Sequence, residues 1–381
     1  MPEIGVPANE QPTYPLELLR CEACGLVQLG VEVDRRVIFP PDYTYRSNTT
    51  RAMRDNFAEL YRDCREMFAL GPSDLCIDIG SNDGTLLSNF RDGGHPVLGI
   101  EPTRAAEDAI GHGIRTIMAF FCRETALRCR AEFGRAKIVT ATNVLAHAGE
   151  IRSFVAGVAE LLQQDGVFVA EVGYLASLIE TLQYDTVYHE HLRFYHLGAL
   201  KRLLEGAGLE IFHVQRIPAH GGSLRVYSSL NSQQELRPSV NETLLAEADA
   251  GLLDGTALTP FRARVVRSKL QLYDLLAGIK GRNERIYGIG ASPRATTLIN
   301  YVGLDAGILD GVLEIAGSPS IGRYVPGTRI PILDERRLFE DQPEYALLLS
   351  WHIADALAGN LRRNGFRGKF IVPLAEPRVL P

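Results

Sequence analysis

The sequence predicts an α/β protein whose main feature is a doubly wound parallel sheet, followed by a second α/β region. The first observation is a series of short apolar segments separated by stretches of helical periodicity, a pattern typical of strands that alternate with helices. These strands are expected at 75–79, 97–100, 138–141 and 166–171. The second observation is that the rhythm returns later in the chain, with strands expected at 285–289, 307–313, 345–349 and 369–372.

This pattern divides the chain into three expected domains. Residues 1–50 form a small module, residues 51–215 carry the first sheet, and residues 216–381 carry the second. An amphipathic helix is expected over 51–70, where apolar side chains recur at helical spacing. A further, polar helical stretch is expected over 241–280.

The composition is that of an ordinary globular protein and excludes some classes of partner. Apolar residues make up 46% and charged residues 23%, and the formal charge is 40 − 46 = −6. A mildly acidic chain without a basic cluster argues against nucleic acid or an anionic membrane as the main partner. The sequence has no run of 18 apolar residues and its N-terminus lacks the features of a signal peptide, so we expect a cytoplasmic protein.

A tight turn after the first strand carries the most informative residues. The segment 75–85 reads L-C-I-D-I-G-S-N-D-G-T, which is typical of a strand end, a turn and a helix start. Glu101 and Pro102 follow the next strand, where a carboxylate can accept hydrogen bonds from both hydroxyls of a ribose. The sequence therefore predicts a pocket for an adenosine-bearing ligand. Within the turn, the residues expected to contact it are Asp78, Gly80, Asn82, Asp83 and Gly84.

The nature of that ligand follows from what the turn lacks. A dinucleotide site needs G-x-G-x-x-G, whereas Ser81 stands where an early second glycine is expected. The carboxylates of Asp78 and Asp83 repel phosphate and favour an amino group and a sulfonium cation, which describes S-adenosylmethionine. The competing interpretation is a strand-turn-helix unit that binds no ligand.

Titratable residues gather at 188–191, which reads Y-H-E-H, just after the fourth strand. In an extended segment Tyr188 and Glu190 project to one side, and the two histidines to the other. Histidine is a suitable general base near neutral pH, and a nearby tyrosine or carboxylate can orient it. The spacing excludes the H-E-x-x-H zinc motif. An interdomain hydrogen-bond network or a polar surface loop remains the alternative.

Further polar candidates lie at the same expected edge of the sheet. Asn143 and His147 follow the strand at 138–141, although Asn143 could equally cap a helix and His147 could be a packing residue. The candidates for substrate binding are Tyr43, Tyr45, His220, Gly221 and Arg225. Each of these alone is more often structural than functional.

Cysteine spacing indicates half of a metal site. The chain has six cysteines, of which Cys21 and Cys24 form the one C-x-x-C pair. A tetrahedral zinc site needs four ligands, so this pair is a half-site.

Eight ordered stretches together form a recognisable pattern. They are C-x-x-C-G-L-V-Q-L at 21–29, Y-T-Y-R-S at 43–47, D-I-G-S-N-D-G at 78–84, G-I-E-P at 99–102, N-V-L-A-H at 143–147, Y-H-E-H-L at 188–192, H-G-G-S-L-R at 220–225 and P-G-T-R-I-P-I at 326–332. In these the chain resembles the sugar C-methyltransferases of antibiotic deoxysugar biosynthesis, which methylate C-3 of nucleotide-linked 4-keto sugars.

The resemblance implies a fold, a cofactor and a set of roles. It implies an N-terminal zinc-binding module, a central Rossmann-like S-adenosylmethionine domain and a C-terminal Rossmann-like domain that helps to bind the sugar nucleotide, expected to be dTDP-linked. The turn 80–84 and Glu101 would hold the cofactor, with Asn143 nearby. His191 would be the base that removes the C-3 proton. The residues that would surround the sugar are Tyr188, Glu190, His147 and a tyrosine of the 43–45 loop. The oligomeric state stays open.

The chain departs from the family pattern in two places. Members carry another C-x-x-C upstream, which this chain lacks, so we expect either absent first ligands or a metal-free module. Pro293-Arg294 also stands where relatives have a lysine, although arginine can bind phosphate as well. Two other classes stay open: an NAD(P)-dependent sugar-nucleotide oxidoreductase or epimerase centred on the Gly288–Gly290 turn, and an inactive binding protein with the same fold.

Overall fold

The computed structural model describes residues 1, 11–40, 43, 45–230 and 233–381, which fall into two compact units. The central unit comprises Glu17–Ser177 and His189–Gly255. The C-terminal unit comprises Thr256–Pro381 together with Met1–Leu16 and Leu178–Tyr188. In the part of the chain that is described, none of the helices is both long and apolar enough to span a bilayer.

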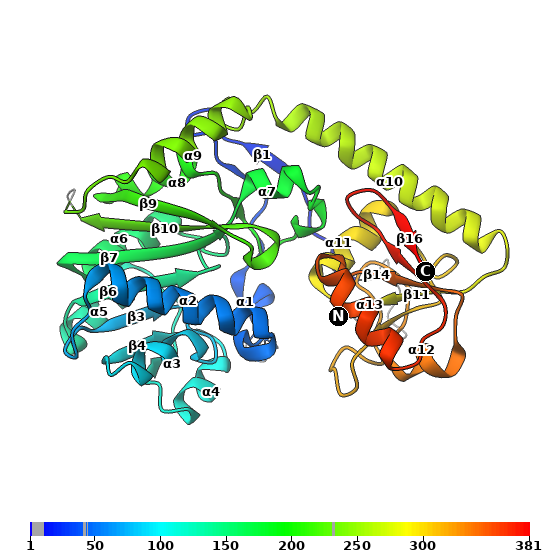
Figure 1. The fold of residues 1–381 in the computed structure, drawn as a ribbon, viewed down its shortest axis with the longest axis horizontal. Helices are drawn as coiled ribbons and strands as arrows, with labels where there is room; N and C mark the ends of the chain where they lie inside the picture. Colours follow the sequence, from blue (N-terminus) through cyan, green and yellow to red (C-terminus); the bar gives the residue numbers. More distant parts are fainter. Residues whose placement is uncertain (2–10, 41–42, 44, 231–232) are drawn as a thin grey trace. The chain divides into compact units, whose positions relative to one another are not determined.

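A seven-stranded sheet forms the centre of the central unit, in the order β5-β4-β3-β6-β7-β10-β9 (Figure 1). Its strands are β3 (Cys76–Ile79), β4 (Val97–Ile100), β5 (Thr116–Ile117), β6 (Ala136–Thr142), β7 (Leu162–Gly173), β9 (Leu209–Ile217) and β10 (Ser223–Leu230). The first five strands in the sheet order are parallel, whereas β10 is antiparallel to both β7 and β9. The predicted parallel α/β sheet is confirmed, and the antiparallel pair is an addition that the periodicity did not predict.

Helices cover this sheet and bury the apolar faces that the sequence indicates. They are α2 (Arg51–Phe68), α3 (Thr85–Asp92), α4 (Ala105–Gly111), α5 (Arg123–Phe133), α6 (Ile151–Leu161), α8 (Leu197–Glu205) and α9 (Pro238–Asp249). The expected helix over 51–70 is α2, which begins where the Thr50 side chain accepts the N–H of Met53. Its buried side chains Phe57 and Leu60 pack against the sheet in one core cluster. α7 (Leu175–Glu180) begins in the central unit and ends in the 178–188 segment.

The N-terminal region does not form a separate module. β1 (Leu18–Arg20), β2 (Val27–Leu29) and β8 (Arg193–Phe194) make a three-stranded antiparallel sheet, and α1 (Arg35–Ile38) follows it. β2 pairs with β8, and Val27 lies opposite Phe194. Residues that precede α2 are therefore joined to a segment almost 170 positions later in the chain. Residues 17–50 therefore fold with the central unit rather than beside it.

The compact central unit extends past the domain boundary expected at 215/216. β10 inserts between β7 and β9, so the chain as far as Gly255 belongs to the central unit. The helical stretch expected over 241–280 is two helices, α9 and α10 (Leu258–Lys280). They are separated at Gly251 and Gly255, which adopt φ of +69° and +85° and so interrupt a helix.

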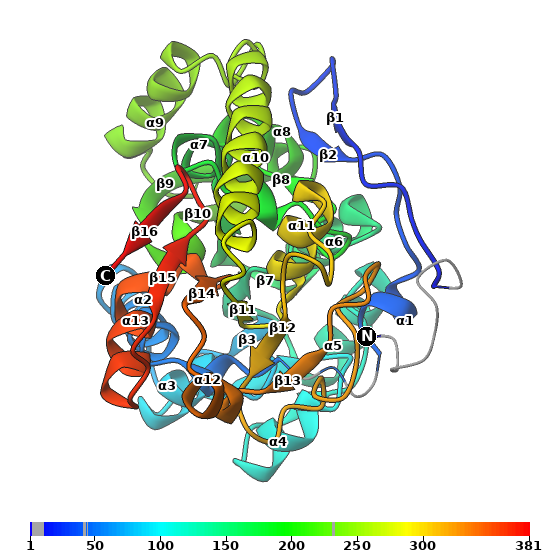
Figure 2. The ribbon, with the colours of Figure 1, turned by 90° about the vertical axis from the view of Figure 1, so that its right-hand side faces the viewer.

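The C-terminal unit is built on a six-stranded sheet in the order β13-β12-β11-β14-β15-β16 (Figure 2). Its strands are β11 (Ile286–Ile289), β12 (Gly311–Glu314), β13 (Ile332–Asp334), β14 (Tyr345–Leu348), β15 (Lys369–Val372) and β16 (Arg378–Leu380). Its helices are α10, α11 (Pro293–Val302), α12 (Arg336–Asp341) and α13 (Ala354–Arg363). The four expected strands are present as β11, β12, β14 and β15, all parallel, while β16 is antiparallel to β15.

Candidate active site

The turn after β3 has the tight geometry that its glycines predict. Gly80 and Gly84 adopt φ of +72° and +79°, and α3 begins directly after them at Thr85. A Cβ at Gly80 would lie 2.4 Å from the Val144 side chain, so only glycine fits. This contact also brings the ends of β3 and β6 together, since Val144 follows β6.

Glu101 faces this turn from the end of β4. Its Oε2 accepts the backbone N–H of Asn82 at 3.1 Å, and its Oε1 accepts the N–H and the hydroxyl of Thr103 at 2.9 and 2.6 Å. The residue is 5% exposed. Each carboxylate oxygen has two lone pairs, so Glu101 is held in place yet keeps capacity to accept a further donor.

The other acidic residues of the turn differ from the expected direct ligands. Asp78 is buried and accepts the Thr140 hydroxyl at 2.6 Å, and burial raises its pKa to about 7 although that hydrogen bond lowers it. It therefore supports the turn from within the sheet. The Asn82 and Asp83 side chains accept the N–H groups of Ser47 and Asn48, each at 3.0 Å. These two side chains therefore hold a neighbouring segment of the chain against the turn.

Asn143 lies at the same edge of the sheet as this turn. It follows β6, its N–H donates to the Glu171 carbonyl at 2.8 Å, and its φ is +57°. The alternative of a helix cap is wrong, because the next helix, α6, begins at Ile151. A left-handed backbone is favoured for Asn over most other residues and turns this position out of the strand.

Two histidines from distant segments meet beside this edge. The rings of His147 and His191 have centroids 5.1 Å apart at an interplanar angle of 63°. They are brought together because the N–H of Leu192 donates to the Ala146 carbonyl at 2.8 Å. Burial, with a smaller contribution from His220, lowers the pKa of His147 to about 4, although hydrogen bonds to the backbone of Glu190 and Asn143 act in the opposite direction. His147 is therefore neutral at physiological pH.

Tyr43 and Glu190 complete this cluster. The Tyr43 hydroxyl donates to Glu190 Oε2 at 2.9 Å, and burial raises the pKa of Glu190 despite that bond. Phe39 packs edge-on against both Tyr43 and His147, with centroid separations of 5.3 and 5.4 Å. Tyr43, His147, Glu190 and His191 thus form one cluster within the central unit. Tyr188 is the last residue of the 178–188 segment, which folds with the C-terminal unit.

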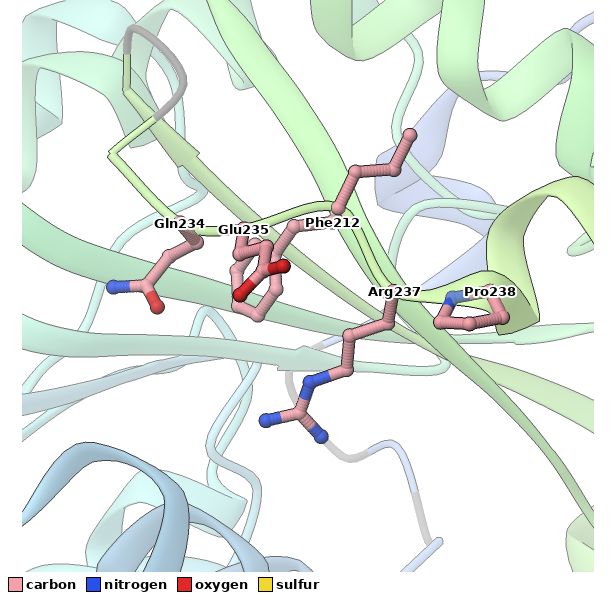
Figure 3. Close-up of a pocket in the computed structure, with 6 residues that line it drawn as sticks. Phe212, Gln234, Glu235, Arg237 and Pro238 are labelled. Carbon is pink, nitrogen blue, oxygen red and sulfur yellow. The ribbon is translucent and has the colours of Figure 1, made fainter.

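A narrow cavity opens on part of this cluster. It is lined by Glu32, Val33, Arg35, Ile38, Phe39, His147, His189, Glu190 and Leu192. A larger hollow of about 400 Å³ is lined by Phe212 and residues 234–238 (Figure 3). None of the predicted site residues lines that larger hollow, so we do not connect it with the chemistry.

Arg225 does not have the expected role in substrate binding. Its side chain is fully buried, and its guanidinium donates to Glu171 at 2.8 Å and to Asp63 at 2.9 Å. Two further bonds reach the Asn56 side chain and the Glu59 carboxylate. Because β10 pairs with β7, Arg225 stands opposite Glu171 in register and is used to tie the sheet to α2. The neighbouring His220 is exposed, with a φ of 54°, in the turn before β10.

The Cys21–Cys24 half-site remains without further metal ligands. Among the described residues, no group of three or more His, Cys, Asp or Glu side chains could hold a metal ion, so zinc is not indicated. Hydrogen bonds to backbone carbonyls hold this loop instead. Arg202 donates to the Ala23 carbonyl at 2.6 Å, and His196 Nε2 lies 3.3 Å from the Gly25 carbonyl. The residues present therefore do not fit a tetrahedral zinc site.

The turn in the C-terminal unit repeats the geometry of the first one. Gly290 adopts φ of +93°, and Glu314, at the end of β12, accepts the Ala291 N–H at 2.6 Å. Arg294, expected to be able to bind phosphate, donates instead to both oxygens of the buried Asp185 at 2.8 and 3.0 Å. Its guanidinium is occupied by an ion pair within the unit.

Sequence reasoning missed the residues that organise this site. Phe39 and Arg46 contact the tyrosine segment, and Thr103 fixes Glu101. Arg46 lies in the Y-T-Y-R-S stretch, from which the two tyrosines are predicted as site residues but the arginine is not. Asp108, the partner of Arg46, lies 62 positions away and no local pattern marks it.

Comparison with known proteins identifies two matching family models. Residues 45–214 match a model described as a methyltransferase domain, and residues 218–375 match the C-methyltransferase C-terminal domain. The chain is 32% identical to the C-methyltransferase NovU of Streptomyces niveus, over 98% of this chain and 89% of NovU.

Solved structures resemble it more distantly. A methyltransferase solved in complex with the Trm112 activator of Haloferax volcanii covers 47% of this chain and 92% of its own, at 13% identity and a TM-score of 0.38. The magnesium protoporphyrin IX methyltransferase ChlM of Synechocystis, solved with bound SAH, covers 49% of this chain and 90% of its own, at 12% identity and the same TM-score of 0.38.

Proposed function

Because the chain belongs to the C-methyltransferase family, we propose that it transfers the methyl group of S-adenosylmethionine to C-3 of a nucleotide-linked 4-keto deoxysugar. One observation carries this proposal: the Glu101 carboxylate faces the glycine turn in the same unit as the cluster of Tyr43, His147, Glu190 and His191. A ribose acceptor and a general base therefore belong to one folded body.

The residues of the turn fit the proposed cofactor. Gly80 and Gly84 let the backbone approach a ligand closely, and Glu101 retains one lone pair for a ribose hydroxyl. The Ser81 hydroxyl is buried and has no hydrogen-bond partner among the described residues. When bound, S-adenosylmethionine supplies an electrophilic methyl group on a sulfonium. We assign its binding to the turn Gly80–Gly84, Glu101 and Pro102, with Asn143 at the neighbouring strand end.

The proposed reaction begins with a proton transfer. A C-4 ketone makes the C-3 hydrogen acidic, and His191 removes that proton as its C–H electron pair passes toward the ketone oxygen. The resulting enolate carbon forms a bond with the methyl group as the bond from that methyl to sulfur breaks, and the sulfur keeps the electron pair. Hydrogen-bond donors directed at the ketone oxygen would stabilise the developing charge.

The neighbours of His191 support this division of roles. His147 is neutral at working pH because its pKa is about 4, so it does not raise the cost of placing a proton on His191. Its Nδ1 is buried and lacks a partner among the described residues, which leaves it for a substrate hydroxyl. Tyr43 orients Glu190 through their hydrogen bond, so the Glu190 carboxyl group would have a fixed orientation toward the sugar.

Mass spectrometry of products tests the proposal. We expect a panel of dTDP-linked 4-keto deoxysugars, incubated with labelled S-adenosylmethionine, to include one that gains a methyl group on carbon. Methylation of oxygen or nitrogen instead, or of none of the panel, would overturn the C-3 assignment. A role in making a deoxysugar of an antibiotic belongs to the same proposal.

A variant tests the base. His191→Asn should keep cofactor binding while methyl transfer falls by about 10²–10⁴-fold, the usual contribution of a general base. The exposed His112, which follows α4, provides the matched control, and His112→Asn should have unchanged turnover. Wild-type turnover in His191→Asn would remove this residue from the assignment.

A further inference from the structure

Arg46 joins the tyrosine segment to a helix beside the cofactor turn. Its Nε donates to Asp108 Oδ2 on α4 at 2.5 Å, and its Nη1 donates to the Tyr43 and Tyr45 carbonyls at 2.9 and 3.1 Å. One side chain thus fixes two carbonyls of the segment that carries Tyr43. Only the planar, multi-donor guanidinium can make these three contacts together.

The residues that follow Arg46 are bound to the cofactor turn itself. The N–H groups of Ser47 and Asn48 donate to the Asn82 and Asp83 side chains, each at 3.0 Å, and Asn82 Nδ2 donates to the Tyr45 carbonyl at 3.2 Å. Asn82 therefore accepts a bond from this segment, returns one to it, and donates its own N–H to Glu101.

At its other end the segment contacts the predicted sugar site. Tyr43 donates to Glu190 and packs against Phe39, which in turn packs against His147. A continuous series of hydrogen bonds therefore leads from Glu101 through Asn82 and Tyr45 to Arg46 and Tyr43. All of these residues belong to the central unit.

We propose that Arg46 is a positioning residue that holds Tyr43 against Glu190 and links its position to that of the cofactor turn. The inference rests on the proposed function, because it assigns the two ends of the series to cofactor and sugar. Its consequence is that a ligand which orders the Gly80–Gly84 turn also orders the sugar site, so the two substrates bind with positive coupling.

The contacts distinguish Arg46 from Arg51, the next arginine along the chain. Arg51, five positions later, makes one ion pair with Asp55, and both side chains are mostly exposed. Such a pair contributes little to stability or order. Arg46 is 29% exposed and binds two backbone carbonyls in addition to its carboxylate. Arg51→Ala is therefore the matched control.

Hydrogen exchange of the full chain tests the link without any sugar. In the wild type, S-adenosylhomocysteine should slow exchange of the Ser47 and Asn48 amides by about tenfold or more, because their acceptors belong to the ordered turn. The ligand should also slow exchange of the Tyr43 amide, which donates to the Pro40 carbonyl. In Arg46→Ala the slowing at Tyr43 should be lost and that at Ser47 and Asn48 should persist, because of these three residues only Tyr43 has its carbonyl held by Arg46. The variant should still bind S-adenosylhomocysteine with an affinity within about threefold of wild type. Arg51→Ala should behave as the wild type.

Steady-state kinetics with a dTDP-linked 4-keto deoxysugar give the second measurement. Arg46→Ala should lower kcat/KM for the sugar by about 10–100-fold, while the affinity for S-adenosylmethionine measured without sugar stays within about threefold of wild type, because the coupling acts only when both substrates are bound. Arg46→Lys keeps a cation for Asp108 but cannot reach both carbonyls, so it should not restore the rate. Full rescue by lysine would reduce Arg46 to an ion-pair partner and overturn the proposal.

The two measurements separate failure of this inference from failure of the proposed function. If no keto sugar is methylated, the proposed function fails, yet the exchange experiment still decides whether Arg46 links the segment to the turn. If methyl transfer occurs but ligand-dependent slowing of the Tyr43 amide persists in Arg46→Ala, the link is wrong while the proposed function stands. The positioning role would also be overturned if Arg46→Ala lowered the thermal midpoint of unfolding and amide exchange became faster throughout the protein.

Discussion

Glu101→Gln changes one atom at the residue on which the cofactor assignment depends. The carboxylate accepts three hydrogen bonds, one from Asn82 and two from Thr103. A glutamine can offer its oxygen to Thr103, but its amide then turns an N–H toward the N–H of Asn82. An unmet donor in a buried place costs about 1–3 kcal/mol, so the free energy of unfolding should fall by about that amount.

The same change weakens cofactor binding by a separate amount. Charge-assisted hydrogen bonds are about twice as strong as neutral ones, so replacing the one such bond that Glu101 can still accept from a ribose hydroxyl loses about 1 kcal/mol, or about fivefold in Kd. Isothermal titration with S-adenosylhomocysteine and urea denaturation measure the two effects independently. Glu107→Gln, at an exposed residue on the neighbouring α4, is the control. A Kd within twofold of wild type in Glu101→Gln would refute the ribose assignment.

Two further predictions concern stability. Arg225→Met should lower the free energy of unfolding by about 3–5 kcal/mol, because it leaves the buried Glu171 without its cation. Urea denaturation measures this change. An effect no larger than that of Arg115→Met, which removes an exposed ion pair, would contradict the prediction. His147 has a pKa of about 4 when folded against 6.5 otherwise, so the unfolded chain binds the proton first and stability falls as pH drops from 6.5 to 4. The loss amounts to about 3 kcal/mol, and His147→Gln should remove it from the pH profile of unfolding. Asp78, whose folded pKa is about 7, acts in the opposite direction, losing stability as pH rises from about 4 to 7, so the wild-type profile alone does not isolate His147.

Local patterns were sufficient where the structure depends on near neighbours. The turn after β3 needs positive φ at Gly80 and Gly84, and glycine at those positions marks it in the sequence. The spacing of Glu101 follows from the length of one helix and one strand. The face of α2 that is buried follows from periodicity alone.

Non-local pairing explains what the sequence left undetermined. β10 joins the central sheet because Arg225 and its neighbours pair with residues of β7 about 50 positions earlier, and no turn signal between them specifies this partner. The same insertion buries Arg225 against Glu171 and Asp63, which turns an expected substrate ligand into a structural residue. Asn82 and Asp83 could not be separated from true ligands, because their partners at Ser47 and Asn48 lie 35 positions before them.

The two glycine turns show why a motif does not by itself specify a function. Glu101 accepts the N–H of Asn82 in one unit, and Glu314 accepts that of Ala291 in the other, so the backbone device is the same. The surroundings of the two turns differ. Beside the first turn, Arg46 binds the segment of Tyr43, which contacts the carboxyl group of Glu190 near two histidines. Beside the second turn, Arg294 forms an ion pair with Asp185. The groups that the proposed reaction uses, a base and a ribose acceptor, therefore belong to the surroundings of the first turn.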